Sequence, residues 1–136
     1  MPTPKGKSPT TRDAGRRIIA ELMGADYLAR KDARENRFSS SLNEYAEEVC
    51  FGRTWSHEGI DRKQRSIVTI AVMVALNRPT QLGLHVEGAL NNGVTPRELR
   101  EILLHTAVYC GLPAAGSAFA VTEDALTAAQ IESDTD

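Results

Sequence analysis

Several features that mark large classes of protein are scarce in this sequence. Its two cysteines, Cys50 and Cys110, lie far apart and outside any CxxC motif, which excludes a disulfide-stapled secreted scaffold. Aromatic residues make up only 5% of the chain, which disfavours an aromatic-rich β-sandwich. The most apolar run, residues 67–76, has about half the length that crosses a bilayer, and no apolar secretory signal begins the chain. These absences predict a cytoplasmic protein that does not enter a membrane.

Charge and the familiar site motifs exclude further classes of function. The chain has 16 Lys and Arg against 18 Asp and Glu, a net charge of −2, which gives no general reason to bind nucleic acid. Neither GxGxxG, GxxxxGK[ST] nor GxSxG occurs, and the three histidines lack metal-ligand spacing. We therefore expect no nucleotide cofactor and no metal.

What remains is a chain rich in aliphatic residues with helical periodicity. Hydrophobic residues make up 41%, and no segment shows sustained alternation of apolar and polar residues. We predict a compact all-α domain of six or seven helices over residues 11–131, between a flexible lead (1–10) and an acidic tail (132–136). The predicted helices cover residues 12–23, part of 26–37, 42–50, 61–76, 80–91, 96–110 and 114–131.

Local signals predict where several of these helices begin and end. Asp61 with Gln64, and Thr95 with Pro96 and Glu98, have the spacing of N-terminal capping boxes. Ser41-Leu-Asn-Glu44 has the same spacing, so a helix is predicted to begin there. Residues 51–60 contain two glycines and the single tryptophan, and are predicted to form a loop.

A few residues could carry chemistry, and spacing alone leaves each of them open. His85 lies in the middle of a predicted helix, and a core histidine and a catalytic one are equally compatible with its apolar neighbours. Arg65 could offer a guanidinium to a carboxylate or lie in solvent. Glu48 could act as an acid or base if buried, and Glu47 reads as solvated. His57 follows Trp55 in the predicted loop and could serve a site or be exposed.

A longer pattern adds to these single residues. The apolar helix that begins at Asp61 is followed by Leu84-His-Val86, by an Asn-Gly turn and by the helix capped at Thr95. In this order the segments resemble the carboxymuconolactone decarboxylase family over about residues 40–125. The resembling segments are residues 61–79, 84–86, 89–95, 98–104, 109–115 and 118–119.

The resemblance implies an enzyme, a carboxy-lyase of aromatic (protocatechuate) catabolism that needs no cofactor. It would convert 4-carboxymuconolactone to the 3-oxoadipate enol-lactone, by stabilising a dienolate and protonating the α-carbon. The resemblance also implies a homo-oligomer, a trimer or hexamer. The roles implied for single residues are oxyanion or proton donor for His85, carboxylate clamp for Arg65, acid or base for Glu48, and substrate contacts for Trp55, His57 and Tyr109.

Two departures from the wider group qualify this expectation. Alkylhydroperoxidase-like relatives carry a CxxC before the equivalent histidine, but Arg78 and Gln81 stand there, so a thiol peroxidase is disfavoured. Decarboxylase-like members have Arg-Pro where this chain has His57-Glu58, which removes a cation. A different lactone or small acid, an isomerase or hydrolase step, or a non-catalytic oligomeric member are the alternatives.

Overall fold

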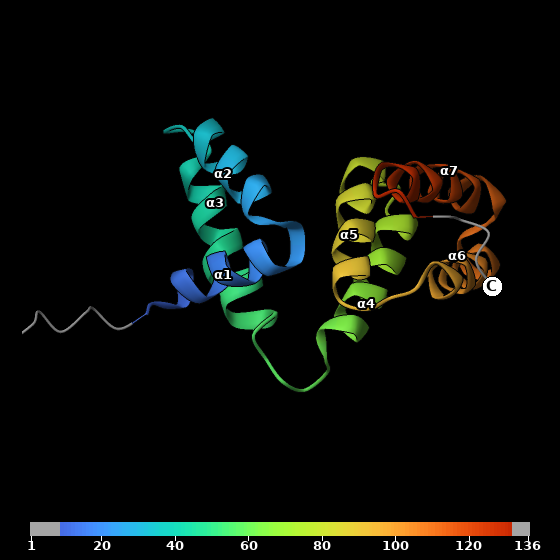
Figure 1. The fold of residues 1–136 in the computed structure, drawn as a ribbon, viewed down its shortest axis with the longest axis horizontal. Helices are drawn as coiled ribbons and strands as arrows, with labels where there is room; N and C mark the ends of the chain where they lie inside the picture. Colours follow the sequence, from blue (N-terminus) through green and yellow to red (C-terminus); the bar gives the residue numbers. More distant parts are fainter. Residues whose placement is uncertain (1–8, 132–136) are drawn as a thin grey trace, which may run out of the picture. The chain divides into compact units, whose positions relative to one another are not determined.

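The computed structural model describes residues 9–131, and within them it contains helices and connecting loops but no strand (Figure 1). The all-α prediction is therefore confirmed. The predicted acidic tail, and all but two residues of the predicted lead, lie outside the described residues. The helices are α1 (Thr11–Met23), α2 (Ala25–Arg34), α3 (Ser40–Tyr45), the π-helix η1 (Ala46–Thr54), α4 (Arg62–Ala75), α5 (Pro79–Asn91), α6 (Pro96–Cys110) and α7 (Leu112–Ala128).

The contacts between helices divide the chain into two compact units. The first unit (Met1–Glu58) contains α1, α2, α3 and η1, and the second unit (Gly59–Asp136) contains α4 to α7. A single domain over residues 11–131 stays a prediction. Within the described part of the chain, no helix combines the length and apolar character needed to cross a membrane.

The predicted capping boxes at Asp61 and Thr95 are confirmed. The Asp61 carboxylate accepts a hydrogen bond of 2.8 Å from the Gln64 amide, and the Thr95 hydroxyl accepts one of 3.1 Å from the Glu98 amide. Each box satisfies amide groups that have no partner inside the helix, so it fixes the first residue of α4 and of α6. Gly111, at φ 90°, ends α6 in a conformation that other residues rarely adopt.

The region around α3 and η1 differs from the prediction in two ways. α3 begins at Ser40 after Ser39, with no side-chain cap, so the predicted box at Ser41 and Glu44 is wrong. Residues 51–54, predicted as loop, belong to the π-helix, and the Trp55 amide donates to the Cys50 carbonyl at 3.0 Å. Apolar side chains that follow one another in the sequence explain the extension, because the wider turn buries them against α1.

The first unit has a small core that depends on close approach of α1 and η1. Trp55 packs with Ile18 and Leu22 of α1, and these side chains are buried. Gly15 of α1 lies against the Glu47 carbonyl so closely that a Cβ atom there would overlap it. A Cβ atom on Gly52 would likewise overlap the Thr11 carbonyl. The absence of side chains at these two glycines therefore lets the two helices meet backbone to backbone.

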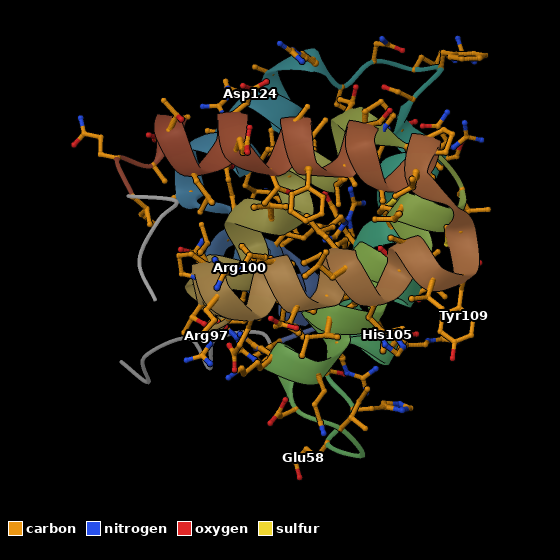
Figure 2. All side chains as sticks on the ribbon, turned by 90° about the vertical axis from the view of Figure 1, so that its right-hand side faces the viewer. Glu58, Arg97, Arg100, His105, Tyr109 and Asp124 are labelled. Atoms are coloured by element: carbon orange, nitrogen blue, oxygen red, sulfur yellow. The ribbon has the colours of Figure 1, made fainter. Side chains whose placement is uncertain are left out.

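The second unit is a four-helix arrangement around one aliphatic core, with α6 and α7 along one side (Figures 1 and 2). Although α4 is the apolar helix predicted from Asp61, its Val68 and Val72 are 55% and 42% exposed. Only one side of α4 faces this core. The core side chains come from all four helices and the turn before α6, and are Ile70, Val74, Leu82, Val86, Ala89, Val94, Leu99, Leu103, Ala118 and Leu126.

Candidate active site

The predicted site residues are divided between the two units. Glu48, Trp55 and His57 belong to the first unit, in or just after η1. The second unit contains the other three residues, with Arg65 on α4, His85 on α5 and Tyr109 on α6. Each unit is therefore described by itself.

His85 lies in the middle of α5, between the buried Leu82 one turn before it and the buried Ala89 one turn after it. The residue is half-buried, and its Nδ1 atom is shielded from solvent. Burial lowers the pKa of His85 from its ordinary value, because the charged imidazolium loses solvation there. The side chain is therefore neutral at neutral pH, a state in which one ring nitrogen donates a hydrogen bond and the other accepts one.

Arg65 lies in the first turn of α4, is half-buried and has its Nε atom shielded from solvent. α4 packs directly on α5. The Asn92 amide, just after α5, donates to the Ser66 hydroxyl at 2.9 Å and to the Arg62 carbonyl at 3.3 Å. Asn92 follows His85 by two helical turns, so the same side of α5 carries both. These hydrogen bonds fix the start of α4, which carries Arg65, against the end of α5, which carries His85.

Tyr109 lies on the exposed side of α6 and does not line the core of the second unit. Its ring is 78% exposed and rests against the exposed His105, with 5.2 Å between ring centroids (Figure 2). His105 is therefore no core residue. A substrate contact by Tyr109 stays a prediction.

The three candidates in the first unit have different environments. Glu48 is 39% exposed and pairs with Arg53 at 3.6 Å, so it is neither deeply buried nor isolated. Trp55 is buried in the core and stacks on Phe51, with ring centroids 5.8 Å apart. His57 is exposed in the segment after η1. The substrate contacts assigned to Trp55 and His57 stay predictions.

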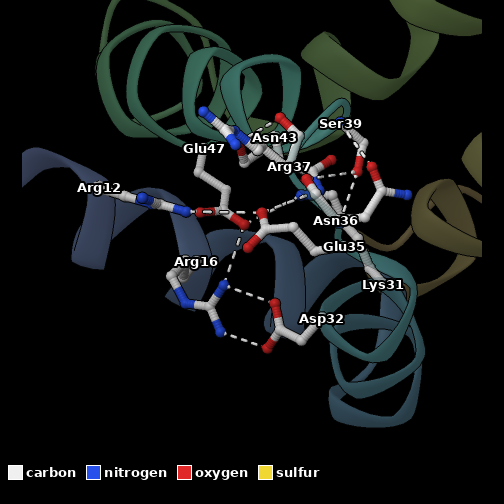
Figure 3. A network of polar contacts seen from close by, with 11 residues as sticks. Arg12, Arg16, Lys31, Asp32, Glu35, Asn36, Arg37, Ser39, Asn43 and Glu47 are labelled. Atoms are coloured by element: carbon white, nitrogen blue, oxygen red, sulfur yellow. Dashed lines mark hydrogen bonds and ion pairs between the residues drawn. The ribbon is translucent and has the colours of Figure 1, made fainter.

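The most tightly bound carboxylate of the first unit is one that sequence reasoning missed. Glu47 reads as solvated in the sequence, but it is 1% exposed. Its two oxygens accept hydrogen bonds from Arg12 at 2.7 Å and from Arg16 and Lys31 at 3.0 Å each, within the polar network of Figure 3. Arg16 also binds Asp32 through two contacts of 2.6 and 2.9 Å. The four-residue spacing of Arg12 and Arg16, which puts both on one side of α1, was the available signal.

The charges around Glu47 explain its protonation state. Burial by itself would raise the pKa of the Glu47 carboxyl, but the hydrogen bonds from Arg12 and Lys31 outweigh it, and the pKa is lowered. The hydrogen bond from Arg16 likewise lowers the pKa of Asp32. Glu47 is therefore an ionised carboxylate with three cationic partners, which makes it a structural anchor joining α1, α2 and η1.

No group of three or more histidine, cysteine or acidic side chains within residues 9–131 is arranged to hold a metal ion. The chemistry offered by the second unit is that of a neutral imidazole and a guanidinium on adjoining helices. Such groups can stabilise an oxyanion and hold a carboxylate.

The chain is similar to several known proteins. The nitrosuccinic acid decarboxylase npaB of Metarhizium robertsii is 38% identical over 111 residues, which are 82% of this chain and 78% of that protein. The 4-carboxymuconolactone decarboxylase of Acinetobacter baylyi is 36% identical over 110 residues, 81% of this chain and 82% of that protein. An uncharacterised 15.0 kDa protein from the nqo9–nqo10 intergenic region of Paracoccus denitrificans is 37% identical over 79 residues, 56% of this chain and 58% of that protein.

A family match covers more than half of the chain. Residues 41–124 match the carboxymuconolactone decarboxylase family, which agrees with the resemblance found over about residues 40–125. The matched region includes α4 and α5 with Arg65 and His85, and also Glu48. Together with the two decarboxylases, this match confirms the expectation of a carboxy-lyase. The chain belongs to the carboxymuconolactone decarboxylase family.

Proposed function

We propose that the protein decarboxylates a small organic acid with two carboxylates, 4-carboxymuconolactone or a close lactone acid, without a cofactor. The observation that carries the proposal is the neutral, half-buried His85 on α5, beside α4 with Arg65, in a chain similar to two decarboxylases. A neutral imidazole can donate a hydrogen bond to developing negative charge, and a guanidinium can hold a carboxylate by two parallel hydrogen bonds.

The reaction follows from the structure of the lactone acid. The bond between the ring carbon and the departing carboxylate breaks, and carbon dioxide leaves. The electron pair moves through the unsaturated ring onto the carbonyl oxygen of the lactone, which gives a dienolate. A proton then adds to the α-carbon, and the enol-lactone results. Arg65 is assigned to the substrate carboxylate, and His85 to the oxyanion or to delivery of the proton. The acid or base role of Glu48, which belongs to the first unit, stays a prediction from the sequence.

Nitrosuccinate is the second candidate substrate. It is named for a relative that is 38% identical over 82% of this chain. Like the lactone acid, nitrosuccinate has a second carboxylate. It also has an electron acceptor beside the reacting carbon, because the nitro oxygens can take the electron pair. His57 and Glu58, which replace the Arg-Pro expected in decarboxylase-like members, leave the choice between these substrates to experiment.

A direct assay tests the proposal. Purified protein is incubated with 4-carboxymuconolactone and, separately, with nitrosuccinate, and carbon dioxide release and loss of substrate are followed by NMR. We expect release above the buffer rate with one substrate, at a stoichiometry of one carbon dioxide per substrate consumed. Rates equal to buffer with both substrates would contradict the proposal, provided that circular dichroism shows the protein to be helical.

We also propose that the chain forms the homo-oligomer that the resemblance implies. Large apolar side chains are exposed on α4 and α6, two helices that contact each other, and at the start of α7. A second copy of the chain would remove them from water, which is favourable. A cytoplasmic location and a role in aromatic catabolism stay predictions from the sequence. The exposed residues are Val68, Val72, Leu76, Leu104, Val108, Tyr109 and Leu112.

Replacing the 79%-exposed Val108 by glutamate is expected to lower the oligomer mass, because a charge buried at an apolar interface is costly. Light scattering after size-exclusion chromatography measures the mass. Glu101→Gln on the same helix, also exposed, is the matched control. A wild-type protein that elutes as a monomer at all concentrations would contradict the proposed oligomer.

A further inference from the structure

The second unit has a cavity whose lining residues do not come from α4 or α5, the helices that carry Arg65 and His85. It has a volume of about 160 Å³ and lies between α6 and α7, on the side of the second unit shown in Figure 2. Neither His85 nor Arg65 lines it. Its apolar wall is formed by Leu103, Phe119 and Leu126, and its polar wall by Arg100, Thr122 and Glu123.

Thr122 is the most unusual residue of this cavity. It is 4% exposed, and its Oγ1 atom is buried without a hydrogen-bond partner among the described residues. A hydroxyl in a helix normally donates to a carbonyl of the preceding turn, as Thr106 does here to Leu103 at 2.7 Å. A buried polar group without a partner is costly and rare in folded proteins. Rotation of the Thr122 side chain to its other helical rotamer would turn the hydroxyl toward the cavity, where a ligand oxygen would supply the missing hydrogen bond.

The charged residues define the ligand further. The side chain of Arg100 forms no ion pair or hydrogen bond within residues 9–131, so its guanidinium is available to a ligand. Glu123 brings a negative charge to the same cavity from α7. One arginine together with one glutamate favours a ligand with a single carboxylate, because a second carboxylate would be repelled. This preference differs from that of the proposed active site, whose substrate carries two.

The size and apolar wall limit the rest of the ligand. A cavity of about 150 Å³ lined by aliphatic and aromatic side chains is large enough to hold benzene. The ring of Phe119 can pack against a second ring by offset stacking or edge-to-face contact. We propose that this cavity is a binding site for a monocarboxylate with one aromatic ring or an apolar body of similar size. The carboxylate contacts Arg100 and Thr122, and the ring lies against Phe119.

Titration with sodium benzoate, followed by methyl and amide NMR, tests the proposal without reference to activity. We expect saturable shifts at Leu103, Phe119 and Leu126. Arg100→Gln is expected to weaken benzoate binding about tenfold, since a charge-assisted hydrogen bond is lost. Arg97→Gln is the matched control, because Arg97 is exposed on the same helix but does not line the cavity (Figure 2). It should bind benzoate as wild type does.

Thr122→Val separates the hydroxyl from the shape of the cavity. We expect the variant to unfold at a higher temperature, since it lacks the unpartnered hydroxyl, and to bind benzoate about threefold to tenfold more weakly. Benzyl alcohol, which lacks the carboxylate, should bind Arg100→Gln and wild type equally. Shifts confined to α4 and α5, equal weakening by Arg97→Gln and Arg100→Gln, or no saturable shift would each overturn the proposal. Decarboxylase activity does not enter these readouts, so the two proposals fail separately.

Discussion

Replacement of His85 by alanine is expected to lower kcat by about 10²–10³-fold, the usual effect of removing one oxyanion donor from an active site. The reason is that the electron pair left by carbon dioxide has to be stabilised before a proton reaches the carbon. His85 is the one candidate that is half-buried, neutral at neutral pH and placed in the family match. Steady-state rates of carbon dioxide release measure the effect.

Two further variants separate a catalytic role of His85 from a structural one. His85→Gln keeps a hydrogen-bond donor and should recover part of the lost kcat. Glu87→Gln changes an exposed residue of the same helix and should leave both kcat and the unfolding temperature unchanged. Full activity of His85→Ala would remove His85 from the mechanism.

Arg65→Gln is expected to raise KM more than it lowers kcat, because a carboxylate clamp binds ground state and transition state alike.

The pH dependence of kcat distinguishes the two roles assigned to His85. Its pKa is lowered, so the imidazole stays neutral from high pH down to a pH below the ordinary histidine pKa of about 6.5. If neutral His85 donates a hydrogen bond, kcat should be constant above that pH and should fall as the pH drops through the lowered pKa. If a protonated His85 delivers the proton, kcat should instead rise over the same range on acidification. The profile of His85→Gln should lack this transition.

Replacement of Glu47 by glutamine is expected to destabilise the first unit by about 3–5 kcal/mol, the usual cost of removing one partner of a buried ion pair. Glu47 is 1% exposed and accepts hydrogen bonds from three cations. The glutamine amide would accept fewer of these bonds and would remove the negative charge that all three cations share, leaving Arg16 with Asp32 and Arg12 with Glu35 at 3.9 Å. Denaturant unfolding followed by Trp55 fluorescence measures the loss, because the single tryptophan lies in the core of this unit.

The neighbouring carboxylate provides the control for this prediction. Glu48→Gln alters a 39%-exposed side chain paired only with Arg53, so its free energy of unfolding should change by less than about 1 kcal/mol. Equal destabilisation by the two variants would contradict the role of Glu47 as the anchor.

The stability of the first unit should also depend on pH through Glu47. The folded-state pKa of Glu47 lies below its unfolded value, so the unfolded chain binds the proton more readily. The stabilisation is therefore complete above about pH 4.5 and is lost as the pH falls through the lowered pKa. The difference in unfolding free energy between wild type and Glu47→Gln should shrink in that range. Asp32, whose pKa is also lowered, loses its stabilisation in the same direction as the pH falls in both proteins.

The family and the positions of most helices could be predicted from the sequence because they depend on local chemistry. The cap at Asp61 and the cap at Thr95 each satisfy amides within three residues, so the relevant groups are adjacent in the chain. The segments around His85 and Thr95 keep the order and spacing of the family. These features need no knowledge of which helix contacts which.

The tertiary structure decided what depends on contacts between distant residues. Glu47 and Glu48 are neighbours with the same chemistry, and only the approach of α1 and α2 shows that Glu47 is buried with three cations while Glu48 is not. The π-helix at residues 46–54 forms where a wider turn buries apolar side chains against α1. The lowered pKa of His85 and the cavity beside Thr122 also result from contacts between residues that are distant in the sequence. By itself, the sequence determined the all-α class, the caps at Asp61 and Thr95, and the family. The structure decided which side chains are buried and which charges meet, and these contacts shift the pKa of His85 and of Glu47.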